Sequence, residues 1–349
     1  AQMRSKLIFD KGGAGKTQHV KLIGNLYDSC QVVTSILLEF LTSDDFVIED
    51  DHNRSESALA KYASSMPSLK SLLLDYAMDA PSAWMLYRPV IQLDYRSRKA
   101  SNGKSAIKIK ENYVERTEVI KSVLPTSIQK DLTPSLVDFF FSYSLYDVYL
   151  PEESYTSSIS RLKRVEDALV HKQRIANSES DKHFTRDDEM ELGRIRRVAT
   201  RLPDDMNAQA SRFGWCVGKL KNQCSGLFPS ETVSTASVQA FFTYCIFPRC
   251  TFGPEDAMYC AHFALLLHAN NTPGFSFMHF VDELMNVVEC SLYSSTEGEA
   301  ASIAILLLET WKVISRWRYN KESFEIEVAG KPGSFMVHDG EGTAPVSYP

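Results

Sequence analysis

Residues 246–263 constrain the fold more than any other stretch, because one apolar helix ends there and another begins. Upstream, residues 233–247 carry apolar side chains three and four positions apart, and Pro248 is expected to stop that helix because it lacks an amide hydrogen. Downstream, Pro254 suits a first helical position, and the two acidic residues after it suit the positive end of the helix dipole. The pattern predicts two helices that meet at a rigid corner.

The same spacing of apolar residues recurs along most of the chain and predicts an all-α fold. In residues 18–41 one helical face comprises Leu22, Ile23, Leu26, Tyr27, Cys30, Val33, Leu37, Phe40 and Leu41. Further helices are expected at 68–78, 82–87, 113–123, 135–150, 205–221, 233–247, 255–270, 276–293 and 297–319. About ten helices joined by short turns are typical of an extended helical array, a HEAT-like α-solenoid in which each helix pair buries one face on its neighbours.

Composition divides the chain into four expected segments. Residues 1–150 form an N-terminal helical segment, and residues 205–335 form a C-terminal helical segment. Between them, residues 151–204 form a charged helical linker region, with a break of low apolar content near 177–188. Residues 336–349 lose the periodicity and are expected to form a mobile tail.

Charge and cysteine content exclude several classes of protein. The 349 residues include 38 basic and 44 acidic side chains, so the formal charge of −6 gives no overall field that would attract a polyanion. The seven cysteines are an odd number scattered through helical patterns, which favours buried thiols in a reducing compartment. No apolar run reaches the roughly 18 residues of a membrane span, so we expect an intracellular, soluble protein without membrane attachment.

Several groups of residues match the pattern of one known family. At the corner they are Phe247, Pro248, Arg249, Cys250, Asp256, Ala257, Tyr259, Cys260, Ala261 and Phe263. Residues 139–155 add Leu145, Tyr146, Asp147, Pro151, Ser154 and Tyr155, and residues 19–30, 273–276, 316–317 and 332–333 follow the same order. Together they resemble the THO complex subunit 2 family. The likeness spans nearly the whole chain but only a middle-to-late portion of the longer subunit, so we expect a fragment.

The resemblance implies a nuclear, non-enzymatic scaffold without cofactors, acting in transcription elongation, mRNA processing and mRNA export. The implied partners are THO complex subunit 1, the WD40-propeller and coiled-coil subunits of the same complex, and a DEAD-box RNA helicase of the mRNA export pathway. The residues alone lead only to a helical array with a binding surface. With the net charge of −6, weak and salt-sensitive RNA contact is the most that we expect.

An alternative function comes from residues 11–17, KGGAGKT, which match a deviant phosphate-binding loop ahead of a strong helix. In a P-loop ATPase, Lys16 would reach the β- and γ-phosphates and Thr17 would hold Mg²⁺. Against this function, Asp10 stands where the standard motif has its first glycine, and the parallel strands of a nucleotide-binding fold are missing downstream. A glycine-rich turn before the helix at Gln18 is the favoured interpretation.

Five residues near the corner could suggest a metal site, namely Cys245, Cys250, Cys260, His262 and His268. Structural zinc sites pair ligands two to four residues apart, whereas four and then nine residues separate these cysteines. Core packing is therefore the favoured interpretation. The chain also lacks a Gly-x-Ser-x-Gly nucleophile elbow, and its paired acids suit solvated helix starts. We assign no catalytic residue, no metal and no cofactor.

Two basic clusters remain as candidate surfaces for RNA or an acidic partner. The first lies in residues 94–110, expected to be an exposed loop, and comprises Arg96, Arg98, Lys99, Lys104, Lys108 and Lys110. The second is expected on a helix and comprises Arg194, Arg196, Arg197 and Arg201. A solvated face is the common origin of such charge runs. The loop cluster is the stronger candidate, because no apolar periodicity there implies packing.

Overall fold

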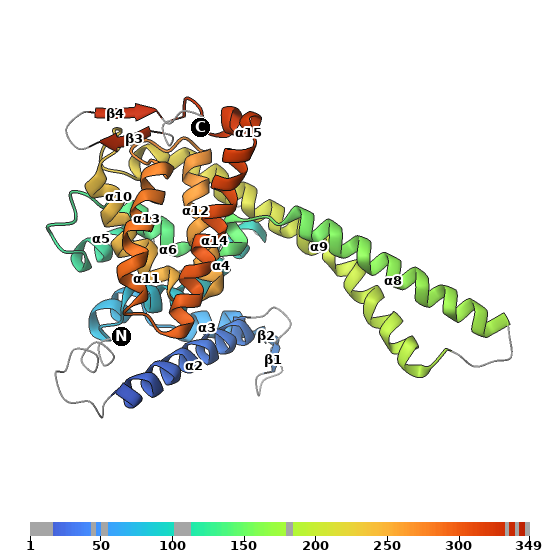
Figure 1. Cartoon of the computed structure of the whole chain (residues 1–349). Helices are drawn as coiled ribbons and strands as arrows, with labels where there is room; N and C mark the ends of the chain where they lie inside the picture. The colour runs from blue at the N-terminus through green and yellow to red at the C-terminus, as the bar shows by residue number, and fades with distance from the viewer. Residues whose placement is uncertain are drawn as a thin grey trace. The chain divides into compact units, whose positions relative to one another are not determined.

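The computed structural model describes seven ranges of the chain, namely residues 17–42, 47–49, 55–100, 113–178, 184–331, 335–338 and 342–345 (Figure 1). Within these ranges the regular structure is helical apart from four strands of three or four residues, which confirms the all-α class. The extended solenoid stays a prediction. In the same ranges, none of the helices combines the length and the apolar character that crossing a membrane requires.

The helical elements before residue 150 are α2 (Thr17–Thr42), α3 (Ala58–Ser65), the π-helical turn η1 (Ser71–Asp75), α4 (Ala80–Ala100), α5 (Tyr113–Val123), α6 (Pro134–Ser142) and α7 (Leu145–Val148). They are followed by α8 (Glu152–Ser178), α9 (Arg186–Gln223), the 3₁₀ turn η2 (Cys224–Gly226), α10 (Thr235–Phe241), the π-helical turn η3 (Phe242–Ile246), α11 (Phe247–Cys250), α12 (Pro254–Ala269), α13 (Phe277–Leu292), α14 (Glu297–Tyr319) and α15 (Lys321–Glu327). Two antiparallel pairs complete the described structure, β1 (Val47–Glu49) with β2 (Ser55–Ser57) and β3 (Phe335–His338) with β4 (Gly342–Pro345), the second of them in the segment expected to be a tail.

Several helices begin within one residue of their expected starts, each after a residue that caps it. Thr133 precedes α6, and its Oγ1 accepts a hydrogen bond from the Leu136 N–H at 3.1 Å. At α14 the Thr296 hydroxyl accepts from the Glu299 N–H while the Glu299 carboxylate accepts from the Thr296 N–H, which forms a complete capping box. Ser276 caps α13 in the same way as Thr133 caps α6. These side chains satisfy amides that have no partner inside the helix, and the predicted starts are confirmed.

Four expected helix boundaries are wrong. α9 continues through Pro203, and α4 continues through Pro89, so residues 94–100 are helical instead of forming a loop. A long helix can lose one backbone hydrogen bond at a proline and keep the others. At the corner, the chain stays helical past Pro248, because the wider turn of η3 directly before it leaves room for the proline ring. Conversely, the helix expected at 135–150 breaks at Tyr143, whose backbone is extended.

The described residues form two compact units. Unit 1 contains those up to residue 145 and those from residue 221 onward, so distant parts of the sequence share one body. Two contacts illustrate this: the Thr133 hydroxyl donates to the Leu227 carbonyl at 2.5 Å, and the ring centroids of Phe140 and Phe241 lie 5.4 Å apart. Unit 2 contains the described residues of 146–220, which are α8, the rest of α7 and most of α9.

The core of unit 1 is aromatic and lies around α6 and α12. Phe140 is fully buried, and its ring meets those of Phe241, Tyr259 and Phe263 nearly edge to face, with centroids 5.1 to 5.4 Å apart. Such pairs contribute about 0.5–1.5 kcal/mol each beyond the burial of their area. Buried residues lie on most sides of α12, which explains why its sequence is apolar nearly all around.

The helix expected at 18–41 is confirmed as α2, but the apolar face predicted to be buried points to solvent. Leu22, Leu26, Val33, Leu37 and Phe40 are between 51% and 66% exposed. The periodicity gave the helix correctly because spacing determines which residues share a face. Which face packs depends on distant residues of the fold, and these select the opposite side of α2.

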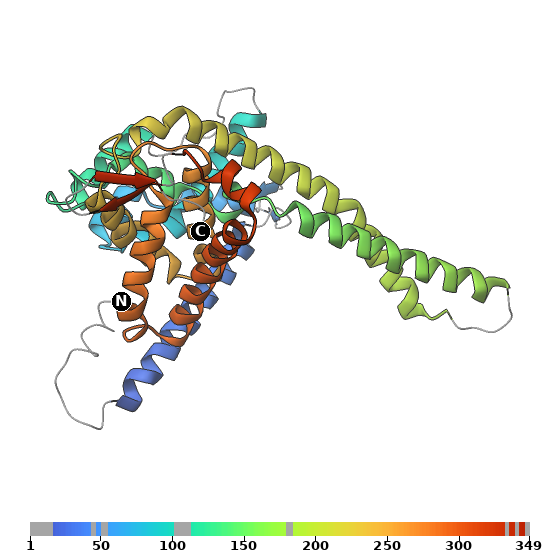
Figure 2. The same cartoon turned by 45° about the horizontal axis from the view of Figure 1, so that its top comes forward.

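In unit 2, α8 and α9 lie side by side and run in opposite directions, forming a helical hairpin (Figures 1 and 2). Lys172 pairs with Asp188 at 2.7 Å, and Glu166 pairs with Arg196 at 2.9 Å. As the residue number falls along α8, it rises along α9, which confirms the antiparallel arrangement. The predicted break near residues 177–188 is the end of one helix and the start of the next, and residues 179–183 lie outside the described ranges.

Gly274 should tolerate no side chain. Its φ is +76°, and a Cβ there would lie 2.2 Å from the Ser230 carbonyl oxygen. We therefore expect Gly274→Ala to lower the free energy of unfolding by more than about 3 kcal/mol in urea titrations. Gly330→Ala is the matched control, because Gly330 has a φ of +72° but open space around its Cβ position. The control should cost only about 1–2 kcal/mol, and equal losses would contradict the steric explanation.

Candidate interaction surface and its supporting core

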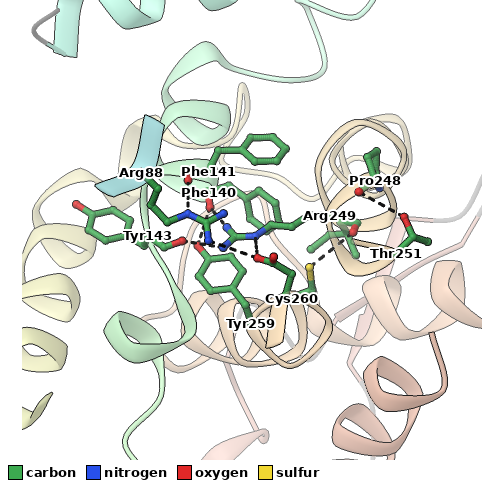
Figure 3. Close-up of polar contacts among 11 residues, drawn as sticks. Arg88, Phe140, Phe141, Tyr143, Pro248, Arg249, Thr251, Tyr259 and Cys260 are labelled. Carbon is green, nitrogen blue, oxygen red and sulfur yellow. Dashed lines mark hydrogen bonds and ion pairs between the residues drawn. The ribbon is translucent and has the colours of Figure 1, made fainter. Parts of the chain in front are cut away.

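The corner brings a fully buried arginine to the end of α6. Arg249, on α11, is 1% exposed, and its guanidinium donates to the carbonyl oxygens of Phe140 at 2.5 Å and Tyr143 at 2.8 Å (Figure 3). Carbonyls at a helix C-terminus have no partner inside the helix, and a cation there also suits the negative end of the helix dipole. Arg249 therefore caps α6 from more than 100 residues further along the chain.

The first turn of α12 supplies the charge that balances this arginine. Arg249 Nε donates to Asp256 Oδ1 at 2.6 Å, and Arg88 on α4 lies 3.6 Å from the same oxygen. Tyr259 places its ring centroid 3.4 Å from the Arg249 guanidinium carbon and donates its hydroxyl to the Phe140 carbonyl at 2.7 Å. One buried network thus joins α4, α6, α11 and α12, and we call it the Arg249 network (Figure 3).

Both members of the central pair stay charged. Burial, the largest single influence, would lower the pKa of Arg249, but Asp256, Tyr259 and Cys260 together hold that pKa above its ordinary value. Burial alone would raise the pKa of Asp256, but Arg249 and Arg88 together hold it below its ordinary value. Removing one partner would leave the other charge buried, which typically costs about 3–5 kcal/mol.

A second buried ion pair supports the other side of α6. Arg116 on α5 donates to both carboxylate oxygens of Asp138, at 2.7 and 3.1 Å. Burial alone would lower the pKa of Arg116, but the bonded Asp138 raises it above its ordinary value. Such a bidentate pair fixes the orientation of two helices as well as their separation. Unit 1 therefore uses buried charges to define helix geometry.

The residues that could suggest a metal site are packed into the core. Cys245, Cys250 and Cys260 are fully buried, and burial raises the pKa of the Cys250 thiol to about 12. His268 places Nε2 2.9 Å from the Glu327 carbonyl oxygen, and burial lowers the pKa of His262 to about 4. In the ranges that the structure describes, no group of three or more His, Cys, Asp or Glu side chains could hold a metal ion.

The other candidate residues fall partly outside the described ranges. Of the loop cluster, Arg96, Arg98 and Lys99 lie in α4, while Lys104, Lys108 and Lys110 are outside. Of the KGGAGKT segment, only its last residue, Thr17, is described, and it is the first residue of α2, whereas Lys16 lies outside. The strands of the described ranges form antiparallel pairs only, without the parallel sheet that a P-loop fold places behind its loop.

Polar contacts within unit 2 anchor α9 beside the residues that precede α8. The Gln209 amide donates to the Tyr149 carbonyl at 2.8 Å, and Tyr155 donates its hydroxyl to Gln209 Oε1, also at 2.8 Å. Arg212 pairs with the buried carboxylate of Asp147. Two of these residues, Asp147 and Tyr155, also carry the family resemblance, and their observed contacts are with other parts of unit 2.

The second basic cluster divides into two parts on α9. Arg196 faces α8 and pairs with Glu166. Arg194, Arg197 and Arg201 are three and four residues apart, so they share one side of α9, which we call the arginine face. Each makes a contact within α9, and the side chains of Arg194 and Arg201 are 74% and 66% exposed. Such exposed contacts are weak, so the arginine face is a candidate surface for an acidic or phosphate-bearing partner.

The sequence placed Arg249 and Asp256 among the residues of the family resemblance and Asp256 at a helix start, but it indicated no structural role for Arg249. The signal that was present is a single arginine inside an otherwise apolar run, because a charge in such a run needs a buried partner. The sequence does not show which groups bond to this arginine. They include two backbone carbonyls at the end of α6, and helical periodicity cannot connect these to residue 249.

The fold and the site together define a helical protein that uses charged side chains to join its helices and to present a basic surface. This arrangement is typical of proteins that bind other macromolecules. A family model described as Tho2, Transcription factor/nuclear export subunit protein 2, matches residues 129–348. The chain therefore belongs to the THO complex subunit 2 family, which confirms the resemblance.

Individual relatives agree with this assignment. The chain is 26% identical over 350 residues to THO complex subunit 2 of Homo sapiens and of Dasypus novemcinctus, with 97% of this chain and 20% of each relative covered. It is 25% identical over 365 residues to THO complex subunit 2 of Arabidopsis thaliana, with 97% of this chain and 19% of the relative covered. The chain spans about a fifth of the length of the curated relatives it matches.

Replacing Arg249 by lysine should destabilise unit 1 although the positive charge is kept. An ammonium group cannot reach the Asp256 carboxylate and two carbonyls with the planar geometry of a guanidinium. We expect Arg249→Lys to lower the free energy of unfolding by about 2–4 kcal/mol in urea titrations. The control Arg194→Lys, at an exposed position, should change it by less than about 0.5 kcal/mol. Similar values for the two variants would contradict the network.

The contribution of Asp256 should depend on pH. Because its pKa is lower in the folded state than in the unfolded state, its stabilising effect is complete above the unfolded value of about 4 and is lost as the pH falls through the folded value. The difference in unfolding free energy between the natural protein and Asp256→Asn should therefore be largest near neutral pH and shrink in acid. Unfolding titrations in small pH steps measure this difference, and a constant value would contradict the assignment.

Proposed function

We propose that the chain is part of a nuclear, non-enzymatic scaffold that organises the other THO complex subunits and docks a DEAD-box RNA-dependent ATPase during co-transcriptional mRNP assembly and mRNA export. The observation that carries this proposal is the family match over residues 129–348. The curated relatives bear the name THO complex subunit 2, and the family description adds nuclear export.

The distribution of charged groups supports a scaffold role without chemistry of its own. The buried charged groups of unit 1, such as Arg249 and the pair Arg116–Asp138, are bonded to carboxylates or to backbone carbonyls. Groups held in this way fix helix positions. A rigid body of this kind suits the holding of partners in defined positions, and no cofactor is needed for it.

We also propose that the helices continue into an extended helical array in the longer family proteins. In such an array each helix pair packs on its neighbours, and long surfaces remain available to partners. Of the described surfaces, the arginine face is the one that we assign to partner binding. Its residues are Arg194, Arg197 and Arg201, on a hairpin whose two helices are joined by ion pairs.

An acidic protein surface is the partner that the charges favour for the arginine face. The chain has a formal charge of −6, which opposes the long-range attraction of RNA, while three neighbouring arginines can still pair with a few carboxylates. The DEAD-box ATPase and the other THO subunits are the partners to test first. RNA contact through the same residues is the competing outcome.

Neutralising the arginine face should weaken partner binding. We expect Arg194→Ala, Arg197→Ala and Arg201→Ala together to raise the Kd for the DEAD-box ATPase about tenfold, which corresponds to about 1.4 kcal/mol. The matched control removes three positive charges from α8 of the same unit, with Arg161→Ala, Arg164→Ala and Arg174→Ala, and should change Kd less than about threefold. Interferometry with the immobilised ATPase, and then with each THO subunit, measures both.

Two results would contradict this assignment. An equal rise in the Kd of the two triple variants would mean that binding depends on net charge and not on the arginine face. The second contradicting result concerns single-stranded RNA. If its affinity falls steeply with salt, and this salt dependence becomes weaker only in the α9 triple variant, the arginine face binds phosphates.

A further inference from the structure

The start of α14 lies beside α2 (Figure 2), and polar contacts between the two help to set the orientation of α2 about its own axis. Asp28 accepts hydrogen bonds from the Thr296 hydroxyl at 2.7 Å and from the Gly298 N–H at 3.1 Å. A carboxylate suits the amide end of a helix, and the approach is close, since a Cβ at residue 298 would lie 3.0 Å from Asp28 Oδ2. Gly24, one turn earlier in α2, is also buried. The side of α2 that packs therefore includes a glycine and a carboxylate beside the buried Leu38.

The opposite side of α2 is apolar. Five large apolar side chains lie on it, namely Leu22, Leu26, Val33, Leu37 and Phe40. Their successive spacings are four, seven, four and three residues. At about 100° per residue, these positions fall within about one-sixth of the circumference of the helix. We call these five side chains the outer stripe, and they are between 51% and 66% exposed. The positions of Gly24 and Leu38, which are buried, lie on the far side of the same helical wheel.

This arrangement is the reverse of what an ordinary surface helix shows. Such a helix turns its apolar stripe toward the core and its polar side toward water. A row of large apolar side chains held outward marks a surface that another element covers. Spacings of three, four and seven residues are those of a stripe that packs against a second helix, with side chains of one helix inserted between those of the other.

We propose that the outer stripe binds an apolar helix supplied by the same polypeptide in the longer family proteins. The curated relatives are about five times as long as the stretch they share with this chain, so their remaining length can supply such a helix. A covalently connected helix binds at a high effective concentration, which favours it over a separate molecule. The stripe itself contains no basic side chain, so it does not suit a nucleic acid.

Cys30 offers a direct probe, because it lies between Leu26 and Val33 on the same side of α2 and is exposed. Cys290, which is exposed on α13, is the matched control within the same molecule. The experiment measures alkylation of both thiols by N-ethylmaleimide, with peptide mass spectrometry, in this chain and in a full-length family protein that carries both cysteines, without other subunits. Cys30 and Cys290 should react at similar rates in the chain.

In the full-length protein we expect Cys30 to react at least about tenfold more slowly, with Cys290 unchanged. Leu26→Asp with Val33→Asp should restore the Cys30 rate, because the charges prevent the apolar contact. An unchanged Cys30 rate in the full-length protein would overturn the proposal. Slow alkylation of Cys30 already in this chain would also overturn the proposal. If dilution restores the rate, a second copy of the chain covers the outer stripe. If dilution does not restore it, another part of this chain covers the stripe. Loss of ATPase binding at the arginine face would leave these outcomes unaffected.

Discussion

The bonds from the Arg249 guanidinium to the end of α6 are the interaction on which the rest of unit 1 depends. They join two helices that meet only after more than 100 intervening residues, and Asp256 extends the same network into α12. Apolar packing of Phe140 against its aromatic neighbours supplies area but little direction. The planar guanidinium supplies direction, because its donors must meet two carbonyls and one carboxylate at once. Apolar packing therefore holds the helices together in the core, and the hydrogen bonds of the guanidinium set their orientation.

The residues that carry the family resemblance act mainly within the fold. Arg249, Asp256 and Tyr259 belong to one network, and Asp147 bonds to Arg212 in unit 2. A segment of this kind can identify a family without marking a site of chemistry, since its residues satisfy buried polar groups that any variant of the fold must satisfy. The exposed residues, such as those of the arginine face, are where binding is to be sought.

Much of the helical structure could be predicted because its causes are local. α5 and α14 begin and end where spacing and capping residues place them, and Thr133 marks the start of α6. Three features could not be read locally. Pro89 and Pro203 sit inside long helices, since the surrounding structure compensates for one missing hydrogen bond. The partners of Arg249 are distant carbonyls. The packed side of α2 is chosen by α3 and α14, so the apolar periodicity identified the helix but assigned its stripe to the wrong environment.

The two sides of α2 show how polar and apolar contacts divide their tasks in this chain. A hydrogen bond contributes little net stability, because water makes the same bond in the unfolded state, but its geometry is strict. Apolar contact is stronger in total and tolerant of orientation. Hydrogen bonds from the start of α14 to Asp28 orient α2. The outer stripe is then available for apolar contact, which does not require a strict geometry. A helix prepared in this way can receive a neighbour without reorienting, so the entropy cost of ordering α2 is met before the neighbour binds.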